Sequence, residues 1–486
     1  HAGKNLSAYI EGAPVITVGN DMREIEENIK EAMLSEGYEV TEDYADAEVC
    51  VVNTCTVTAQ SDSKCRQLIH KIKKANPECL IVLAGCFPQA FEKEASALDE
   101  CGIIVGTGAK KEIPVLIKRY ITSGERIIRI VPRERGEAFE KMTNSGADQK
   151  TRAYIKIQDG CDQYCTYCII PTARGHICSK PLEDIAPEVQ QLVDSGHKEI
   201  ILTGINLCCY GRDFKNGTRL IDAVEAACGC DGDYRVRIGS VEPELISDED
   251  ILRMSKLEKL CPHFHLSLQS GCDETLKRMN RHYDTAEYAE LCEKLRRHFP
   301  NCAITTDIMV GFPQETDEEF EKSLAFAKKI SFAETHIFPY SRRPTTVADK
   351  MKGQLDRKTK HNRAAQMADV CNETKALYLK SLVGTVQEVL FEKETSLQWH
   401  QGHAPNYVTV KIPRTSEEVS LRRQLLRDNL VRWRVLLRKT YMSTKKRTAN
   451  AILFCYIRFF CAQPSFARII SFIFPGLALP FEAFMH

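Results

Sequence analysis

Between residues 151 and 340 the chain repeats one pattern six times, a short apolar strand followed in most cases by an amphipathic helix. The predicted strands are Ala153–Ile157, Glu199–Thr203, Tyr234–Ile238, Phe264–Leu268, Ala303–Met309 and His336–Tyr340. Helical patterns between them lie, for example, at 182–195, 284–298 and 317–329. Strands that alternate with helices are typical of parallel α/β folds, and six such units predict a partial (β/α)6 barrel.

Polar or glycine-containing segments follow every one of these strands. In chain order they are the cysteines of GCDQYCTYC, then Thr203–Asn206, Ser240–Pro243, Gln269–Gly271, Asp307–Thr316 and Tyr340–Arg343. The carboxyl ends of parallel strands meet at one edge of a sheet, where ligands bind and chemistry occurs. We therefore expect one shared site at this edge.

Cys161, Cys165 and Cys168 have the spacing CxxxCxxC. Thiolates with this spacing can hold three irons of a cubane 4Fe–4S cluster and leave the fourth iron open, as a cluster that does chemistry requires. Zinc is the alternative, but zinc generally takes four ligands in paired sets, and no second pair follows at the usual distance. The spacing favours the open-site cluster.

Composition sets broader limits. A chain of 486 residues allows two to four domains. Lys plus Arg and Asp plus Glu number 66 each, so the net charge identifies no partner. Twenty-one cysteines, with no signal-peptide pattern at the first residues, predict a cytoplasmic, reducing location and metal ligation by some thiols. No apolar run reaches the roughly 18 residues of a membrane span, so no membrane association is expected.

Two further domains are expected outside the barrel region, which we place at 147–378. Residues 1–120 alternate helices, near 21–37 and 61–75, with strands, and predict a small open α/β domain. Its predicted strands are Val49–Asn53, Leu80–Ala84 and Ile103–Val105. A polar stretch at 131–150 is interpreted as a linker, and 356–380 as a long helix.

Residues 381–447 contain β patterns at Gly384–Phe391 and Asn406–Ile412 around a predicted loop, Trp399–His403. They predict a small β-barrel, an architecture that often holds nucleic acid. Basic residues dominate Arg422–Arg447, which fits either a solvated face or contact with an RNA backbone. Residues 448–486 form an atypical apolar tail.

With these residues in view, the chain resembles the radical S-adenosylmethionine (SAM) methylthiotransferases over about residues 30 to 415. The segments NTCTVT around Cys55 and AGC at Cys86 are similar to two of the three cysteine motifs that bind an auxiliary 4Fe–4S cluster in that family. The resemblance implies that Cys161, Cys165 and Cys168 hold the cluster that binds and cleaves SAM. It also implies that the small β-barrel is a TRAM-like RNA-binding domain.

Within the family, the segments GCDQYCTYCIIPTARG, LTGIN, TTDIMVGFPQET and HIFPYSRR are most similar to the threonylcarbamoyladenosine branch. The implied reaction is methylthiolation of carbon 2 of that adenosine, beside the tRNA anticodon, with two SAM molecules and a reducing electron donor. The target base must be unstacked from the anticodon loop. We expect a monomer, with Asn206, Glu242, Gln269 and Asp307 lining the SAM site. The isopentenyladenosine branch is the alternative substrate class.

One departure from the family concerns the auxiliary cluster. Its first cysteine belongs near Val18–Asn20, where this chain has none. Cys50 is disfavoured as a substitute because residues five apart on a strand point to opposite faces, so it should face away from Cys55. Cys65 stays open. The chain could thus be an enzyme with impaired thiolation, an enzyme that cleaves SAM only, or a tRNA-binding homologue without catalysis.

His263 and His265 alternate on one predicted strand, as metal ligands sometimes do. We interpret them as core or site-lining residues, because histidines in such positions more often fill these roles.

Overall fold

The computed structural model describes residues 7–12, 29–30, 32–41, 43–140, 151–391, 399–413, 432–436 and 453–454. The chain divides into two compact units, His1–Tyr378 and Leu379–His486. Within the described residues, no helix has both the length and the apolar character needed to cross a membrane.

The first unit begins with a six-stranded parallel sheet of order β2-β1-β3-β4-β5-β6. Its strands are β1 (Ser7–Gly12), β2 (Glu39–Val40), β3 (Val49–Thr54), β4 (Leu80–Gly85), β5 (Cys101–Val105) and β6 (Ile127–Arg129). The three predicted strands are confirmed as β3, β4 and β5. Every residue of β3 and β4 is buried, because helices cover both faces of the sheet.

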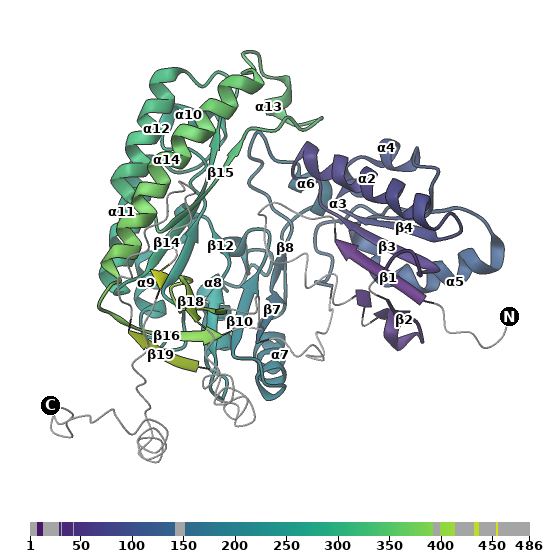
Figure 1. Cartoon of the computed structure of the whole chain (residues 1–486), viewed down its shortest axis with the longest axis horizontal. Helices are drawn as coiled ribbons and strands as arrows, with labels where there is room; N and C mark the ends of the chain where they lie inside the picture. The colour runs from purple at the N-terminus through teal and green to yellow at the C-terminus, as the bar shows by residue number, and fades with distance from the viewer. Residues whose placement is uncertain are drawn as a thin grey trace. The chain divides into compact units, whose positions relative to one another are not determined.

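The covering helices are α2 (Ala59–Ala75) on one face and α5 (Ile113–Ser123) on the other, as Figure 1 shows. Helix α2 begins where the side chain of Thr58 accepts a hydrogen bond from the Ser61 N–H, which satisfies one free donor of the first turn. Residues 29–30 and 32–35 are also helical, and the earlier part of the helix predicted near 21–37 lies outside the described residues.

Seven parallel strands follow, the six that the sequence predicted and the short additional strand β12, and they form two sheets. One has the order β11-β10-β7 and the other β12-β13-β14-β15. The strands are β7 (Arg152–Lys156), β10 (Glu199–Thr203), β11 (Arg235–Ile238), β12 (Ser240–Val241), β13 (His263–Leu266), β14 (Ala303–Val310) and β15 (Glu334–Pro339). Only Gly239 separates β11 from β12. A Cβ on Gly239 would lie 3.0 Å from the carbonyl oxygen of Leu202, so the break comes where two backbones approach closely.

The helices of this partial barrel lie outside the strands. They include α7 (Leu182–Asp194), α8 (Leu220–Cys228), α9 (Asp248–Met254), α10 (Asp273–Arg278), α11 (Thr285–His298), α12 (Asp317–Ile330), α13 (Val347–Lys350) and α14 (Arg357–Ser381). Figure 1 shows α11, α12 and α14 running alongside β14 and β15. Capping boxes start α11 at Asp284 and α12 at Thr316, where each side chain accepts from the N–H three residues later. The four helices predicted after residue 180 are thus confirmed.

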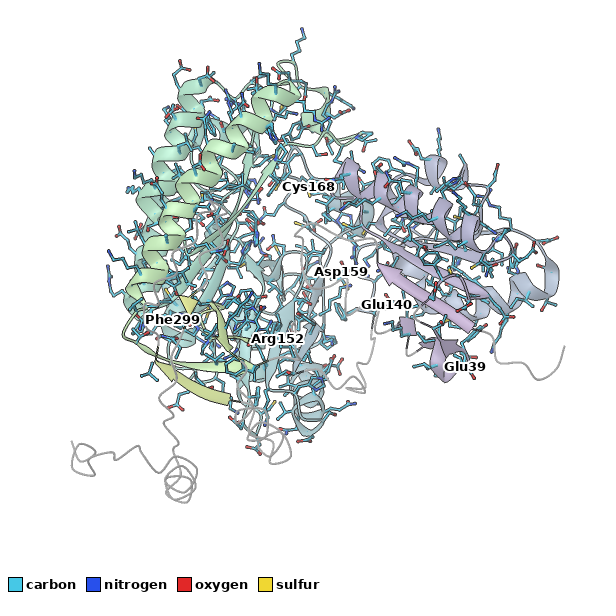
Figure 2. The ribbon with its side chains drawn as sticks, in the orientation of Figure 1. Glu39, Glu140, Arg152, Asp159, Cys168 and Phe299 are labelled. Atoms are coloured by element: carbon cyan, nitrogen blue, oxygen red, sulfur yellow. The ribbon has the colours of Figure 1, made fainter. Side chains whose placement is uncertain are left out.

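The start of the barrel strands holds a buried ionic cluster. Glu199 is fully buried and accepts hydrogen bonds from Arg235 (2.6 Å) and Arg237 (2.9 Å), while the Arg152 guanidinium lies 3.4 Å away. Burial alone would raise the pKa of Glu199, but the charges of Arg237 and Arg235 outweigh it and hold that pKa well below its usual range. Figure 2 shows Arg152 at the start of β7 and Asp159 beyond its end.

Glu199→Gln should lower the free energy of unfolding by about 3–5 kcal/mol, because it leaves buried guanidinium groups without their carboxylate. The exposed Glu258→Gln is the control and should change little. Since the pKa of Glu199 is lower in the folded chain than in the unfolded chain, the ionised carboxylate contributes fully to the free energy of unfolding above the unfolded pKa of about 4.3. It is lost as the pH falls below that value. Urea unfolding at several pH values would measure both effects, and equal stability of the two variants would contradict them.

The segment predicted as a linker has no helix or strand over residues 131–140, but it is not a free tether. The Arg133 side chain is 9% exposed and lies 3.1 Å from the Asp159 carboxylate, and Phe139 is buried beneath Lys156 and Lys180. Residues 141–150 lie outside the described part of the chain.

The second unit contains a five-stranded sheet of order β19-β16-β17-β18-β20. Its strands are β16 (Val386–Phe391), β17 (Trp399–His403), β18 (Thr409–Pro413), β19 (Arg432–Leu436) and β20 (Leu453–Phe454). The prediction of a loop at Trp399–His403 was wrong, since this segment pairs with both β16 and β18. The glycine that suggested a loop, Gly402, allows close strand approach instead, because its Cβ would lie 2.5 Å from the Leu390 carbonyl oxygen. Most of Arg422–Arg447 and nearly all of the apolar tail lie outside the described residues.

Candidate functional site

The loop with three cysteines lies between β8 (Gln158–Asp159) and α6 (Ile170–Arg174), at the carboxyl end of β7. Its sharp entry requires Gly160, which has φ +69° and whose Cβ would lie 1.9 Å from the His176 carbonyl oxygen. The Cys161 N–H donates to the Gly175 carbonyl (3.1 Å), which closes the loop. Figure 2 shows Cys168 beyond Asp159 on this side of the barrel.

Each of the three sulfurs has an N–H donor. The Asn206 amide lies 3.8 Å from the Cys161 Sγ, the Arg281 guanidinium 3.2 Å from the Cys165 Sγ, and the Ile170 N–H 3.5 Å from the Cys168 Sγ. N–H donors of this kind stabilise thiolates that ligate iron.

The thiols themselves are only partly exposed. Burial raises the pKa of Cys161, and it raises the pKa of Cys168 to about 12. Such thiols stay protonated until a metal displaces the protons, since a coordinated thiol loses its proton. Three half-buried sulfurs with their own donors fit a thiolate-ligated iron–sulfur cluster.

The residues predicted to line the SAM site fall into two groups. Asn206 lies at the cysteine loop, and Glu242 is ion-paired with Arg281, the residue that also contacts Cys165. Gln269 and Asp307 lie farther along the four-stranded sheet that begins with β12, and the Gln269 N–H donates to the Asp307 carbonyl (2.9 Å). The structure thus brings Asn206 and Glu242 to the cysteines. The role of all four residues toward SAM stays a prediction.

Asp307 belongs to a second polar group in the barrel. Its carboxylate lies 3.2 Å from the Nε2 of His265, and His336 completes a set whose nitrogen and oxygen atoms lie within 4.8 Å of one another. His263, on the same strand as His265, contacts the Thr305 hydroxyl at 3.2 Å. Sequence reasoning named His263 and His265 as core or site-lining residues but missed the contribution of His336 on β15.

Cys55 and Cys86 directly follow Thr54 and Gly85, which are paired residues of the neighbouring strands β3 and β4. Both cysteines are buried at the carboxyl edge of the N-terminal sheet. The Thr54 hydroxyl donates to the Ala84 carbonyl (2.7 Å) and accepts from the Phe87 N–H (3.1 Å), which fixes the turn into α3 (Cys86–Ala90). Adjacent strands therefore place the two cysteines at a common edge of the sheet.

The other cysteines considered for this site have different surroundings. Cys65 and Cys50 are fully buried in one apolar cluster with Cys101, at the core of the sheet. Burial raises the pKa of Cys65 to about 12. The segment Val18–Asn20, where the family's first cluster cysteine belongs, lies outside the described residues.

Helix α6, which follows the cysteine loop, joins the two groups of cysteines. Its Arg174 is buried, with Nε 3.1 Å from the Cys86 Sγ and a terminal nitrogen 3.4 Å from the Asp159 carboxylate. The Thr107 hydroxyl donates to the Ala173 carbonyl (3.0 Å). Lys110 is buried nearby, where burial and the charge of Arg174 lower its pKa to about 8. Sequence reasoning quoted Arg174 within its motif but assigned it no role.

A second arginine connects the barrel to the Cys55 loop. Arg343 is buried and donates to the Thr56 hydroxyl (2.6 Å) and the Asp62 carboxylate (2.7 Å), and its guanidinium lies 4.7 Å from the centre of the Phe91 ring. Thr56 in turn donates to Asp62 (2.6 Å). The residue after Cys55 is thus held by a side chain that follows the last barrel strand. The sequence motif YSRR contains Arg343, but only the folded structure shows that Arg343 binds Thr56 and Asp62.

Comparison with known proteins agrees with this geometry. Residues 155–327 match the radical SAM superfamily, and residues 13–106 match an uncharacterised protein family, UPF0004. The first match covers most of the partial barrel, through β14, with Cys161, Cys165 and Cys168, and the second covers Cys55 and Cys86. The chain is therefore an enzyme of the radical SAM class, with the 4Fe–4S cluster and SAM that this class implies.

Relatives define the family more closely. The chain is 36% identical to the threonylcarbamoyladenosine tRNA methylthiotransferase MtaB of Bacillus subtilis, over 79% of this chain and 86% of the relative. It is 37% identical to MtaB of Thermotoga maritima, over 75% and 83%. Identity to the tRNA-2-methylthio-N(6)-dimethylallyladenosine synthase of Finegoldia magna is 34%, over 78% and 84%. The chain belongs to the radical-SAM methylthiotransferase family, which confirms the family and enzyme class predicted from the sequence.

Among solved structures, the radical SAM methyltransferase TsrM from Kitasatospora setae matches with a TM-score of 0.52 and 15% identity. The match covers 71% of this chain and 74% of TsrM. At this identity the likeness concerns the fold alone, and it agrees with a partial parallel barrel.

Proposed function

We propose that this enzyme methylthiolates carbon 2 of threonylcarbamoyladenosine beside the anticodon of tRNA. The observation that carries the proposal is the contact between Arg174, on the helix after the three-cysteine loop, and Cys86 of the N-terminal sheet. A reaction that makes a carbon radical and then delivers sulfur to it needs both cysteine groups near one substrate. The names of the Bacillus and Thermotoga relatives support this base as the substrate.

In this proposal Cys161, Cys165 and Cys168 hold the cluster that binds SAM. When bound, the cluster and SAM supply a 5′-deoxyadenosyl radical, which can remove a hydrogen from an unactivated adenine carbon. The protein provides orientation. Asn206 and Arg281 donate to the sulfurs, and Arg281 fixes the carboxylate of Glu242 beside the loop. Gln269, just after β13, and Asp307, on β14, are proposed to approach SAM from these two strands.

The substrate class can be tested directly. Purified tRNAs that carry either threonylcarbamoyladenosine or isopentenyladenosine would be incubated with enzyme, SAM and a reductant, and the nucleosides analysed by mass spectrometry. We expect the methylthio product from threonylcarbamoyladenosine only. Product from isopentenyladenosine alone would assign the enzyme to the branch of the Finegoldia relative, which is 34% identical.

Cys55 and Cys86 are proposed to hold the auxiliary cluster that delivers sulfur. With no cysteine at Val18–Asn20, two thiolates instead of three would hold this cluster, so it should be held less tightly than the first, because each further iron without a thiolate is open to loss and oxidation. Iron and sulfide analysis after anaerobic reconstitution should therefore give one stable cluster and partial occupancy of a second.

Gly19→Cys should raise the occupancy of the second cluster and the yield of methylthiolated tRNA together. Ala13→Cys, six residues earlier, is a control for added thiol and should raise neither. Two full clusters and efficient thiolation in the unmodified chain would show that another residue completes the site. No stable cluster at all would support the tRNA-binding homologue without catalysis, and one cluster with SAM cleavage but no thiolation would support an enzyme that cleaves SAM only.

The second unit is proposed to be a TRAM-like module that binds tRNA. Its sheet and the basic residues of Arg422–Arg447 support this role. Each phosphate contact makes log affinity fall more steeply with log salt concentration, by about 0.7–0.9 in the slope. A chain that ends at Lys380 should therefore bind tRNA more weakly and with a shallower salt dependence, measured by filter binding at several salt concentrations. Equal affinity and equal slope would contradict the proposal.

A further inference from the structure

The polar group formed by His265, Asp307 and His336 contains none of the cysteines. The three residues come from the neighbouring parallel strands β13, β14 and β15. Each is half-buried, so solvent reaches it, and the side chains of His265 and Asp307 are 14% and 24% exposed. Two imidazoles and a carboxylate thus converge on one point inside the first unit.

Their spacing suits a single cation. Two ligand atoms about 2.1 Å from a cation and at right angles to each other are about 3.0 Å apart. The Nε2 of His265 and the Oδ2 of Asp307 are 3.2 Å apart, which already matches. All three ligand atoms lie within 4.8 Å of one another, so a small side-chain rotation of His336 would bring its nitrogen into the same shell.

The surroundings of His265 favour ligation through Nε2. Its Nδ1 lies 3.0 Å from the hydroxyl of Thr305, which is buried. If this hydroxyl accepts the Nδ1 proton, the lone pair is left on Nε2, facing Asp307. Thr305 can then donate its own proton to the Nε2 of His263, 3.2 Å away. A metal-ligating histidine usually has such a partner on its second nitrogen.

From this geometry we propose that His265, Asp307 and His336 bind one divalent transition-metal cation in the barrel. Two imidazoles and one carboxylate suit Mn²⁺, Fe²⁺ or Zn²⁺, whereas Mg²⁺ and Ca²⁺ prefer oxygen ligands only. The set occupies three positions of the cation and leaves others open to solvent or to an oxygen ligand. The site uses none of the cysteine sulfurs and does not depend on the substrate assignment, but it takes the Asp307 carboxylate that is also proposed to line the SAM site. During anaerobic reconstitution it would take up one iron that belongs to no cluster.

Manganese is the most selective probe, because Mn²⁺ prefers carboxylate and imidazole to thiolate. The full chain, with its cluster reconstituted and in the oxidised, EPR-silent state, would be titrated with Mn²⁺ while the EPR signal of free Mn²⁺ is recorded. We expect one tight site per chain. Asp307→Asn and His336→Gln should each weaken binding by at least about tenfold, and Thr305→Val by about 10–100-fold as a partner of a ligand. The exposed His298→Gln, with a histidine also removed, should bind normally.

Circular dichroism would establish that each variant is folded. If the folded Asp307→Asn and His336→Gln variants bound Mn²⁺ as tightly as the unmodified chain, the proposal would be overturned. If a variant does not fold, pulsed EPR of Mn²⁺ bound to the unmodified chain decides the case. Pulsed EPR of bound Mn²⁺ should show nitrogen couplings from two imidazoles, and a spectrum without nitrogen coupling, or the absence of a tight site, would refute the assignment.

Discussion

Replacing Cys161, Cys165 and Cys168 together with alanine is expected to lower the conversion of SAM to 5′-deoxyadenosine by at least about 1000-fold, or about 4 kcal/mol in the activation barrier. The physical reason is that these three sulfurs, each with an N–H donor, are the ligands that fit the SAM-binding cluster. Chromatographic assay of 5′-deoxyadenosine after anaerobic reconstitution measures the effect. Iron analysis should show the loss of the most stable cluster.

Cys371→Ala is the matched control, because Cys371 is a buried thiol on α14. It should keep both the iron content and the SAM cleavage of the unmodified chain. Cleavage at the parental rate in the triple variant would show that the cluster is held elsewhere in the chain.

Arg343→Met should uncouple SAM cleavage from the thiolation of tRNA. It removes the guanidinium that binds Thr56 and Asp62 and leaves the buried Asp62 carboxylate without its cation, at a cost of about 3–5 kcal/mol. The loop that carries Cys55 loses its support, whereas Cys161, Cys165 and Cys168 keep their donors. Methylthiolated tRNA should therefore fall at least about tenfold, or about 1.4 kcal/mol, more than SAM cleavage does.

Both products can be measured in the same reaction, together with the rate at which Cys55 is alkylated, which should rise. Arg343→Lys should restore part of the coupling, since lysine keeps the charge but not the planar fork. Arg342→Met is the neighbouring control, because Arg342 is exposed and pairs with Asp349. An equal loss of thiolation and SAM cleavage in Arg343→Met would assign the residue a purely structural role.

Much of the fold could be predicted because its signals are local. The runs at Glu199–Thr203 and Ala303–Met309 are apolar strands of the expected length, and each lies within one residue of the strand observed. The spacing of Cys161, Cys165 and Cys168 is also local, since all three lie in one short loop. Where a local sequence signal conflicted with the pairing of strands, the prediction of secondary structure failed. Gly402 suggested a loop, but a glycine also lets two strands approach closely.

The sequence alone determined the order of strands and helices, the cysteine loop and the family. Only the tertiary structure decided which distant side chains meet. Arg174 reaches Cys86 across 88 residues of chain, and Arg343 reaches Asp62 across 281. Such contacts leave no periodic pattern, because each depends on how whole sheets and helices pack. The convergence of His265, Asp307 and His336 follows from the register of three parallel strands, which hydrogen bonding between strands sets and the sequence of any one strand does not contain.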